Sequence, residues 1–155
     1  MRWEQGRATV EGMLGRGELE RVAASRAQAE AMLDQAGRHV ATARLAMDSD
    51  PIGAYQLLYD AARKSLGAIL ENQGLRASSR GGHIAVYEAV VAQLDPPLGR
   101  SLRPFDRMRR RRNEAEYPRL GSARFGAEDI RADLPKVEAI MEIAATVLDE
   151  MQPFQ

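Results

Sequence analysis

Hydrophobic residues recur at intervals of three and four positions along most of the chain, the spacing that places them on one face of an α-helix. The alternation of β-branched and polar residues that marks a half-buried strand is nearly absent. The pattern therefore predicts an all-α protein with four to five helices. Because the predicted connections are short, neighbouring helices are expected to run antiparallel, as an up-down helical bundle.

The first two predicted helices have clear start signals. Ser25 begins a capping-box pattern before a helix over residues 26–47. The second helix has Asp50 as N-cap and Pro51 as its first residue, and it ends at Gly74. The apolar stripe of the first helix steps by three and four: Ala29, Leu33, Ala36, Val40, Ala43 and Met47.

Three further helices follow a loop. A short helix is predicted over residues 84–94. Another begins within residues 98–103 and must end before Pro118, because the residue before a proline is pushed out of the helical region. The last helix covers residues 130–151, and Pro135 either kinks it or marks where its regular part begins.

The chain of 155 residues is long enough for one domain with its own core. The first 24 residues are rich in glycine and less periodic than the rest. We therefore predict an N-terminal arm over residues 1–24, with a short helix near residues 9–14, followed by the helical bundle over residues 25–151.

The residue types and apolar segments that the sequence lacks indicate the expected cellular compartment and cofactors. It has no cysteine and two histidines, so no disulfide framework and no zinc site is predicted, and we expect no cofactor. No apolar run is long enough for a signal peptide or a membrane span. The sequence predicts a soluble cytoplasmic protein without a membrane partner.

Charge is balanced overall but segregated along the chain. The 22 Lys and Arg residues equal the 22 Asp and Glu residues. Residues 100–124 hold nine Arg against three acids, whereas residues 126–155 hold seven acids against two cations. Segregation of this kind produces a local positive field on a neutral protein.

The Arg run at residues 109–112 wraps around its helix, because consecutive helical residues point about 100° apart. If Phe105 and Met108 face the bundle, Arg112 is drawn toward the core. Arg110 and Arg111 then face water, and residues 109–111 form a solvated surface that attracts phosphate. One helix earlier, Tyr55 and Tyr59 with Arg63 are interpreted as core packing with an Arg that extends to the surface.

The informative part of the run is Arg112, with Asn113 next to it and Tyr117 at the end of the same helix. Together they offer an anion-binding fork, an amide that donates and accepts, and a phenolic hydroxyl. These three side chains are suited to binding a phosphate group.

A second set of candidate phosphate ligands lies in the loop over residues 74–82 and just after it. Arg76, Arg80 and His83 surround a glycine pair, and with Arg109 they would cradle a phosphate alongside Arg112. The alternative interpretation is that the glycines merely permit the turn and His83 caps the following helix.

The motif residues resemble the HEPN (higher eukaryotes and prokaryotes nucleotide-binding) domain. That family has an Arg, usually followed by a polar residue, and a His after four to six further positions. Residues 26–151 resemble its fold, and residues 54–70 resemble its second-helix pattern. The resemblance implies a four- or five-helix bundle, often a homodimer. Many members are metal-independent ribonucleases, and many of these are toxins paired with a nucleotidyltransferase antitoxin.

Carried onto this sequence, the resemblance assigns Arg112 to the motif Arg, Asn113 to the polar residue and Tyr117 to the position of the His. Tyr117 is a departure, because the His serves the family's ribonucleases as acid/base or phosphate ligand, and an unperturbed Tyr titrates near 10. Some HEPN subgroups end in an acid and a Tyr, as Glu116 and Tyr117 do here.

Two hypotheses follow. In the first, the protein is an RNA- or nucleotide-binding HEPN-like homodimer that cleaves RNA without a metal, with Arg112, Asn113 and Tyr117 as its catalytic set. In the second, it is a catalytically inactive helical dimer that acts as a protein-interaction module, with Arg112 paired to Glu116 or to an acid of the last helix.

Overall fold

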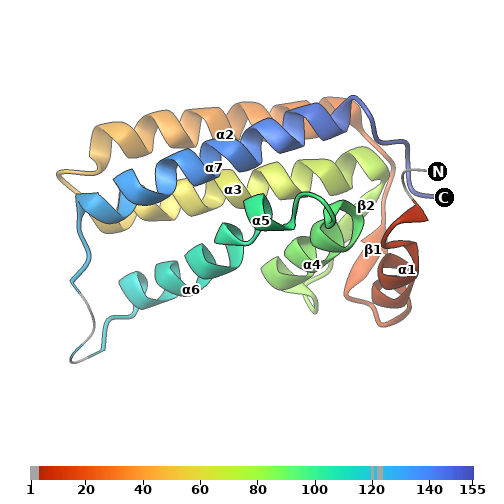
Figure 1. The fold of residues 1–155 in the computed structure, drawn as a ribbon, viewed down its shortest axis with the longest axis horizontal. Helices are drawn as coiled ribbons and strands as arrows, with labels where there is room; N and C mark the ends of the chain where they lie inside the picture. The colour runs from red at the N-terminus through yellow and green to blue at the C-terminus, as the bar shows by residue number, and fades with distance from the viewer. Residues whose placement is uncertain (1–3, 120, 122–123) are drawn as a thin grey trace.

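The longest helices, α2, α3 and α7, lie side by side and form the body of the molecule (Figure 1). The computed structural model describes residues 4–119, 121 and 124–155 of the chain. Its elements are α1 (Arg7–Gly15), β1 (Leu19–Arg21), α2 (Arg26–Ala46), α3 (Pro51–Gln73), β2 (Leu75–Ala77), α4 (Gly82–Leu94), α5 (Gly99–Leu102), α6 (Pro104–Glu116) and α7 (Ala127–Leu148). In Figure 1, α2 and α6 run in one direction, whereas α3 and α7 run in the other. The protein is thus mostly helical, as the apolar spacing predicts.

The N-caps of the first two helices and the end of the second are confirmed, whereas the reciprocal bond of the predicted Ser25 capping box is replaced by a bond from the Ser25 N–H to the Glu71 carbonyl. The Ser25 hydroxyl accepts a hydrogen bond from the Gln28 N–H at 3.0 Å, before α2. The Asp50 carboxylate accepts one from the Gly53 N–H at 3.0 Å, before α3. After α3, Gly74 adopts the left-handed conformation with a φ of 80° and ends the helix. These caps satisfy backbone groups that a helix end leaves without partners.

Replacement of Gly74 by Ala tests the left-handed helix end. The new Cβ would lie 2.9 Å from the Val22 carbonyl oxygen, in a backbone conformation that side chains disfavour. We expect Gly74→Ala to lower the free energy of unfolding by about 1–2 kcal/mol, measured by urea unfolding. The matched control is Gly37→Ala in α2, where a Cβ meets nothing within 4 Å. This change should raise stability by about 0.5–1 kcal/mol, and an equal loss in both variants would contradict the prediction.

The single helix predicted between residues 98–103 and Pro118 is divided in two. Gly99–Leu102 forms α5, and Pro104 is the first residue of α6. A proline has no N–H for a continuing helix but is well suited to a first helical turn, which accounts for the break. The predicted end is confirmed, since Glu116 is the last residue of α6. The last helix runs from Ala127 to Leu148, so it begins and ends three residues earlier than predicted, and Pro135 lies inside it.

A small antiparallel sheet, which the sequence pattern did not predict, joins the N-terminal segment to the bundle. Leu19 pairs with Ala77, and Arg21 pairs with Leu75. Residues 75–77 therefore form a strand within the segment predicted as a loop. Three-residue strands are too short to show an alternating pattern, which explains why the periodicity missed them.

Residues 6–21 pack on the same core as the bundle. The side chains of Val10 and Met13 in α1 are 0% and 1% exposed. Gly6 has a φ of 76°, and a Cβ there would collide with the backbone of Ala92 in α4, so its lack of a side chain allows the close approach. A short helix, α1, thus covers the predicted segment 9–14. Residues 1–3 of the predicted arm lie outside the described residues.

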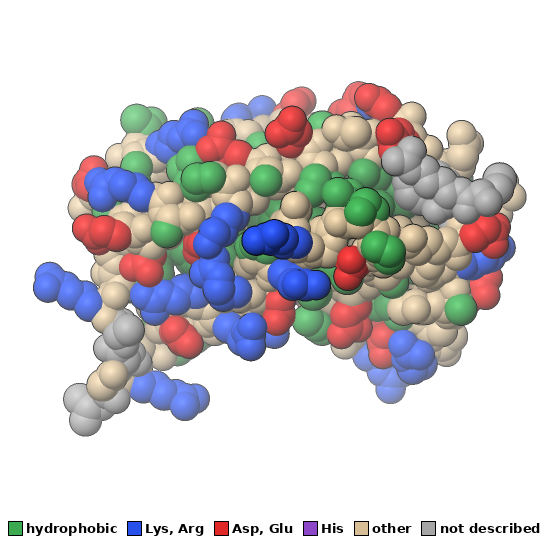
Figure 2. Space-filling model, in the orientation of Figure 1, with side chains coloured by type: hydrophobic (Ala, Val, Ile, Leu, Met, Phe, Trp, Pro, Cys, Tyr) green, Lys and Arg blue, Asp and Glu red, His purple; other side chains and the backbone are tan. Residues whose placement is uncertain are grey.

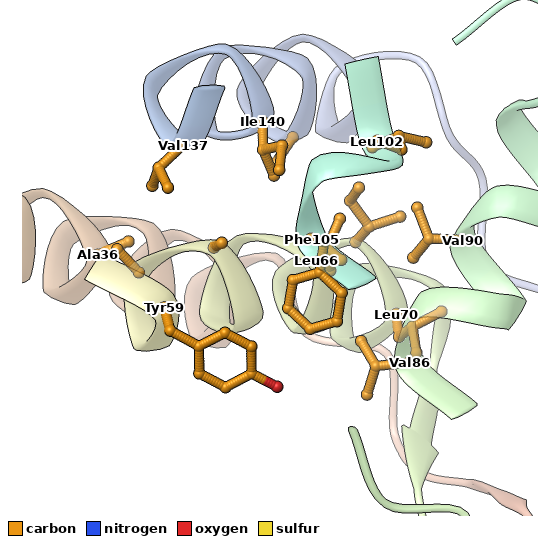
Figure 3. Close-up of a cluster of buried hydrophobic side chains, with 14 of the residues drawn as sticks. Ala36, Tyr59, Leu66, Leu70, Val86, Val90, Leu102, Phe105, Val137 and Ile140 are labelled. Carbon is orange, nitrogen blue, oxygen red and sulfur yellow. The ribbon is translucent and has the colours of Figure 1, made fainter. Parts of the chain in front are cut away.

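The core between α3, α4 and α6 is built around Phe105. Its ring lies parallel to that of Tyr59 at 5.3 Å and to that of Tyr87 at 5.7 Å between centroids. Figure 3 shows Phe105 and Tyr59 among the buried aliphatic side chains of this cluster. Phe105, Met108 and Tyr59 are fully buried, which confirms that this face of α6 turns toward the bundle. The next turn of α6 carries Arg112.

Candidate anion-binding site

Arg112 lies against the bundle rather than in open solvent. Its side chain is 22% exposed. Its Nε donates to the Gln56 Oε1 at 3.0 Å, and its Nη1 donates to the Asn113 Oδ1 at 3.3 Å. Its Cζ lies 5.2 Å from the centre of the Tyr59 ring, and its Nη2 is 3.6 Å from the Glu116 carboxylate. The guanidinium is therefore held by an amide and an aromatic face, with one acid at long range.

Tyr59 connects Arg112 to His83. The Tyr59 hydroxyl lies 2.9 Å from His83 Nδ1, and the two ring centroids are 5.7 Å apart. Figure 3 shows the Tyr59 hydroxyl pointing away from the axis of α3. Three elements thus meet at one phenol: α3 supplies Tyr59, α6 supplies Arg112, and the first turn of α4 supplies the half-buried His83. Arg112 and His83 thus contact the same Tyr59 ring, as a phosphate site shared by Arg112 and the loop residues requires.

The charges that act on His83 are mostly positive, and together with burial they favour its neutral form. Burial lowers the pKa of His83, and the charges of Arg63, Arg112 and Arg109 lower it further. Burial also raises the pKa of Tyr59 to about 12, so its phenol stays protonated. A neutral His in a field of guanidinium groups is an arrangement that an anion would stabilise.

NMR titration of His83 tests this electrostatic picture. We expect its midpoint to lie below the ordinary value of about 6.5. Replacement of Arg112 by Gln removes one nearby positive charge, so the pKa of His83 should rise. His39 is the internal control, because burial and the charge of Lys64 lower its pKa without a contribution from Arg112. A His83 midpoint that Arg112→Gln leaves unchanged would show that the two side chains do not interact.

Tyr117 does not join this cluster. It follows the last turn of α6, where its backbone N–H donates to the Asn113 carbonyl at 3.0 Å. Its side chain is 74% exposed. Of the three motif residues, Arg112 lies in the cluster and Asn113 touches it, whereas Tyr117 faces solvent.

The loop residues divide between two neighbourhoods. Arg76 Nε donates to the Glu71 carboxylate at 2.8 Å, and both residues line a pocket of about 350 Å³. We call it the α3–α4 pocket; Arg63, Gly67, Glu71, Arg76, Ser79 and His83 contribute to its lining. Arg80 instead turns toward the N-terminal segment, where its Nη1 donates to the Arg16 carbonyl at 3.3 Å. Arg76 and His83 thus share one pocket, and Arg80 lies outside it.

The prediction that Arg111 faces water is wrong. Its side chain is 19% exposed and its Nη2 lies 3.0 Å from the Asp129 carboxylate in α7. Its Cζ also lies 4.8 Å from the centre of the Phe125 ring. Arg109 pairs with Asp106 at 3.0 Å and is half-buried. Arg110 is 66% exposed, as predicted, although it also lies 3.4 Å from Asp106.

The segregated charges meet in space. The basic α6 packs on the acidic α7, where Arg107 binds the carboxylate of Asp133, which is 3% exposed. The Tyr55 hydroxyl donates to the same carboxylate at 2.6 Å. Figure 2 shows Lys and Arg side chains gathered over α5 and α6 in this view. Pairing of Arg107 and Arg111 with acids of α7 reduces the positive field that the sequence alone predicts.

Sequence reasoning missed Gln56, Tyr59 and Arg63 as members of the site. The interpretation of Tyr55 and Tyr59 as core residues is confirmed, since both rings are fully buried. Each phenol nevertheless has a polar partner at its far end, as buried tyrosines usually do. The available signal was the four-residue spacing from Tyr59 to Arg63, which places both on one face of α3.

We also searched the described residues for metal sites, further pockets and membrane-spanning helices. No group of three or more metal-ligating acids or histidines lies close enough to hold an ion in the part of the chain that the structure describes. A pocket of about 760 Å³ lies between α4, α5 and α7, and none of the predicted site residues lines it. None of the described helices combines the length and the apolar character that a membrane crossing requires.

Comparison of the chain with protein-family models, with curated proteins and with solved structures returned no match.

Proposed function

We propose that the chain is a HEPN-like protein that binds RNA or a nucleotide through the phosphate, with Arg112 as the principal ligand. The observation that carries the proposal is the contact chain from Arg112 through the Tyr59 ring to His83. It places a half-buried guanidinium next to a neutral imidazole, within the field of Arg63 and Arg109. In such a partly desolvated position a guanidinium binds a phosphate more strongly than it would at the open surface.

The same residues support a metal-independent ribonuclease, as the resemblance implies. Arg112 would stabilise the charge that develops on the pentacoordinate phosphorus. Asn113, which already contacts Arg112, would orient the attacking 2′-hydroxyl or the Arg of a second copy. Tyr117 lies one residue beyond the end of the same helix with its side chain exposed, and would donate a hydrogen bond to the phosphate or to that copy. In this proposal the active form is a homodimer and its partner a nucleotidyltransferase antitoxin.

RNA binding and cleavage with Arg112→Ala test this function. Fluorescence anisotropy with a labelled oligoribonucleotide should show affinity reduced about tenfold or more, the cost of one well-placed phosphate contact. The matched control is Arg110→Ala, which removes the same charge from an exposed position of the same helix. Its affinity should fall only about twofold.

Cleavage is followed with total RNA in the presence of EDTA. The wild-type protein should cleave and Arg112→Ala should not. Equal binding by both variants, together with negligible cleavage by all proteins, would exclude Arg112 as the phosphate ligand.

The second candidate is a catalytically inactive dimer that serves as a protein-interaction module. The contacts of Arg112 with Gln56 and Glu116 of its own chain favour it, because they give the guanidinium a structural role. In that case Arg112→Ala would change only the unfolding midpoint or the dimer fraction, measured by light scattering, and RNA affinity would be the same in all variants.

A further inference from the structure

The α3–α4 pocket is continuous with the Arg112–Tyr59–His83 cluster. Arg63 and His83 line the pocket; His83 is a member of the cluster, and the charge of Arg63 acts on it. Its volume of about 350 Å³ lies within the range of small-molecule sites. The cluster and the pocket therefore form one site with a charged end and an apolar end.

The end of the site away from Arg112 has an apolar floor. Leu70 and Leu75 are 1% and 0% exposed, and Val86 and Met32 complete the surface. Gly67 lies in the middle of α3 and lines the pocket without a side chain of its own. Such a floor suits a flat, largely apolar ring, and a bare phosphate would leave it without a partner.

A buried carboxylate lines the same pocket. Glu71 is 6% exposed and forms an ion pair at 2.8 Å with Arg76, whose own side chain is 53% exposed. An ionised carboxylate only accepts hydrogen bonds, so a ligand group that meets it must donate. Glu71 follows Arg63 by eight positions on α3, a rise of about 12 Å, which is similar to the length of a nucleotide from base edge to phosphate.

We propose that the α3–α4 pocket binds one guanine nucleotide. The base lies on the apolar floor with its N1–H and 2-amino group directed to Glu71, and the phosphate lies at Arg63 and His83, on the side of the site where Arg112 packs on Tyr59. Guanine presents two adjacent donors on this edge, which match the two oxygens of a carboxylate, whereas adenine presents an acceptor beside its amino group. The proposal rests on the proposed function and defines its ligand. The nucleotide is either free or the terminal residue of an RNA strand.

The arrangement also predicts how the phosphate acts on His83. With Nδ1 against the Tyr59 hydroxyl, Nε2 is the ring nitrogen that meets the ligand. A bound phosphate offsets the positive field that lowers the pKa of His83, so binding should raise that pKa.

Isothermal titration calorimetry of the full chain would compare 5′-GMP with 5′-AMP, guanosine and inorganic phosphate. We expect GMP to bind at least about tenfold more tightly than AMP, the discrimination that paired donors confer. Guanosine and phosphate should each bind more weakly than GMP, because each fills only one end of the site. Equal affinity for GMP and AMP, or no binding of either, would overturn the proposal.

Two variants separate the base from the phosphate. Glu71→Gln replaces one acceptor oxygen with a donor, so the preference for GMP over AMP should be lost. Gly67→Leu fills the pocket, and GMP binding should be lost while the charged residues stay in place. Gly37→Leu makes the same change on α2, where the structure has open space, and should bind GMP normally. If Gly67→Leu does not fold, the milder Gly67→Ala takes its place: its Cβ would lie 2.8 Å from Met32 Cε at the pocket, and GMP binding should be weakened.

Competition experiments distinguish the two sources of the nucleotide. GMP bound to the protein is challenged with two oligoribonucleotides, one that carries guanosine only at an end and one that carries it only in the middle. Displacement of GMP by the first oligoribonucleotide alone assigns the pocket to an RNA terminus, and displacement by neither assigns it to the free nucleotide.

The experiments can disprove the pocket assignment and the proposed function independently of each other. If RNA binding depends on Arg112 but no mononucleotide binds and Gly67→Leu has no effect on RNA affinity, the pocket assignment is wrong and the proposed function stands. If neither RNA nor GMP binds, both are wrong.

Discussion

Phe105→Ala is expected to lower the free energy of unfolding by about 4 kcal/mol, because a fully buried aromatic side chain is replaced by a methyl group. The loss is large since Phe105 is stacked between Tyr59 and Tyr87 and joins α6 to α3 and α4. Urea unfolding followed by far-UV circular dichroism measures it. The support of the Tyr59 ring is also lost, so the RNA affinity that the proposed function implies should fall in the same variant.

Two controls define the size of the Phe105 effect. Phe105→Leu keeps most of the buried volume and should cost about 1–2 kcal/mol. Leu45→Ala removes a side chain that is 86% exposed and should change stability by less than about 0.5 kcal/mol. A loss below about 1 kcal/mol for Phe105→Ala would mean that α6 is not anchored through this ring.

Asp133→Ala is expected to lower the free energy of unfolding by about 3 kcal/mol, because it removes one member of a buried charged network. The Tyr55 hydroxyl would lose its acceptor inside the bundle, and Arg107 would lose its partner. Asp133→Asn keeps a carbonyl oxygen for Tyr55 and should cost less. The matched control is Glu138→Ala on the same helix, which breaks an exposed pair with Arg44 and should cost less than about 1 kcal/mol.

The same network predicts a dependence of stability on pH. Burial alone would raise the pKa of Asp133, but hydrogen bonds from Arg107 and Tyr55 and the charges of Arg107 and Lys136 hold it below its ordinary value. A carboxylate whose pKa is lowered by folding stabilises the protein above the unfolded pKa of about 4. That contribution is lost as the pH falls from there through the folded pKa. Unfolding of Asp133→Asn should show a smaller loss of stability in this range, and an identical acid profile would contradict the assignment.

Much of the helical framework was predictable because its signals are local. The Ser25 and Asp50 caps and the left-handed Gly74 depend on the few residues around them, and the structure has each one where it was predicted. The break before Pro104 depends on equally local chemistry but was masked by the continuous apolar spacing on either side. The pairing of β1 with β2 joins residues more than fifty positions apart, and nothing local indicates it.

Only part of the candidate site was predictable from the sequence. Arg112 and Asn113 were chosen for their chemistry, and His83 for its place after a glycine pair. Their meeting depends on Tyr59, whose apolar ring and helical spacing indicate a core residue and give no sign that its hydroxyl reaches another helix. For Arg111 the prediction was wrong, because its exposure was decided by Asp129 on a helix that follows a long connection.

The sequence by itself determined the helical class, most helix boundaries and the face of α6 that turns inward, because these follow from spacing, capping and backbone preferences within a few residues. The tertiary structure decided which charges are neutralised and which remain. It set the acids of α7 against Arg107 and Arg111, and it placed the Tyr59 ring under Arg112 and its hydroxyl on His83. Electrostatic and hydrogen-bonding partners are chosen by distance in space, and a sequence records only distance along the chain.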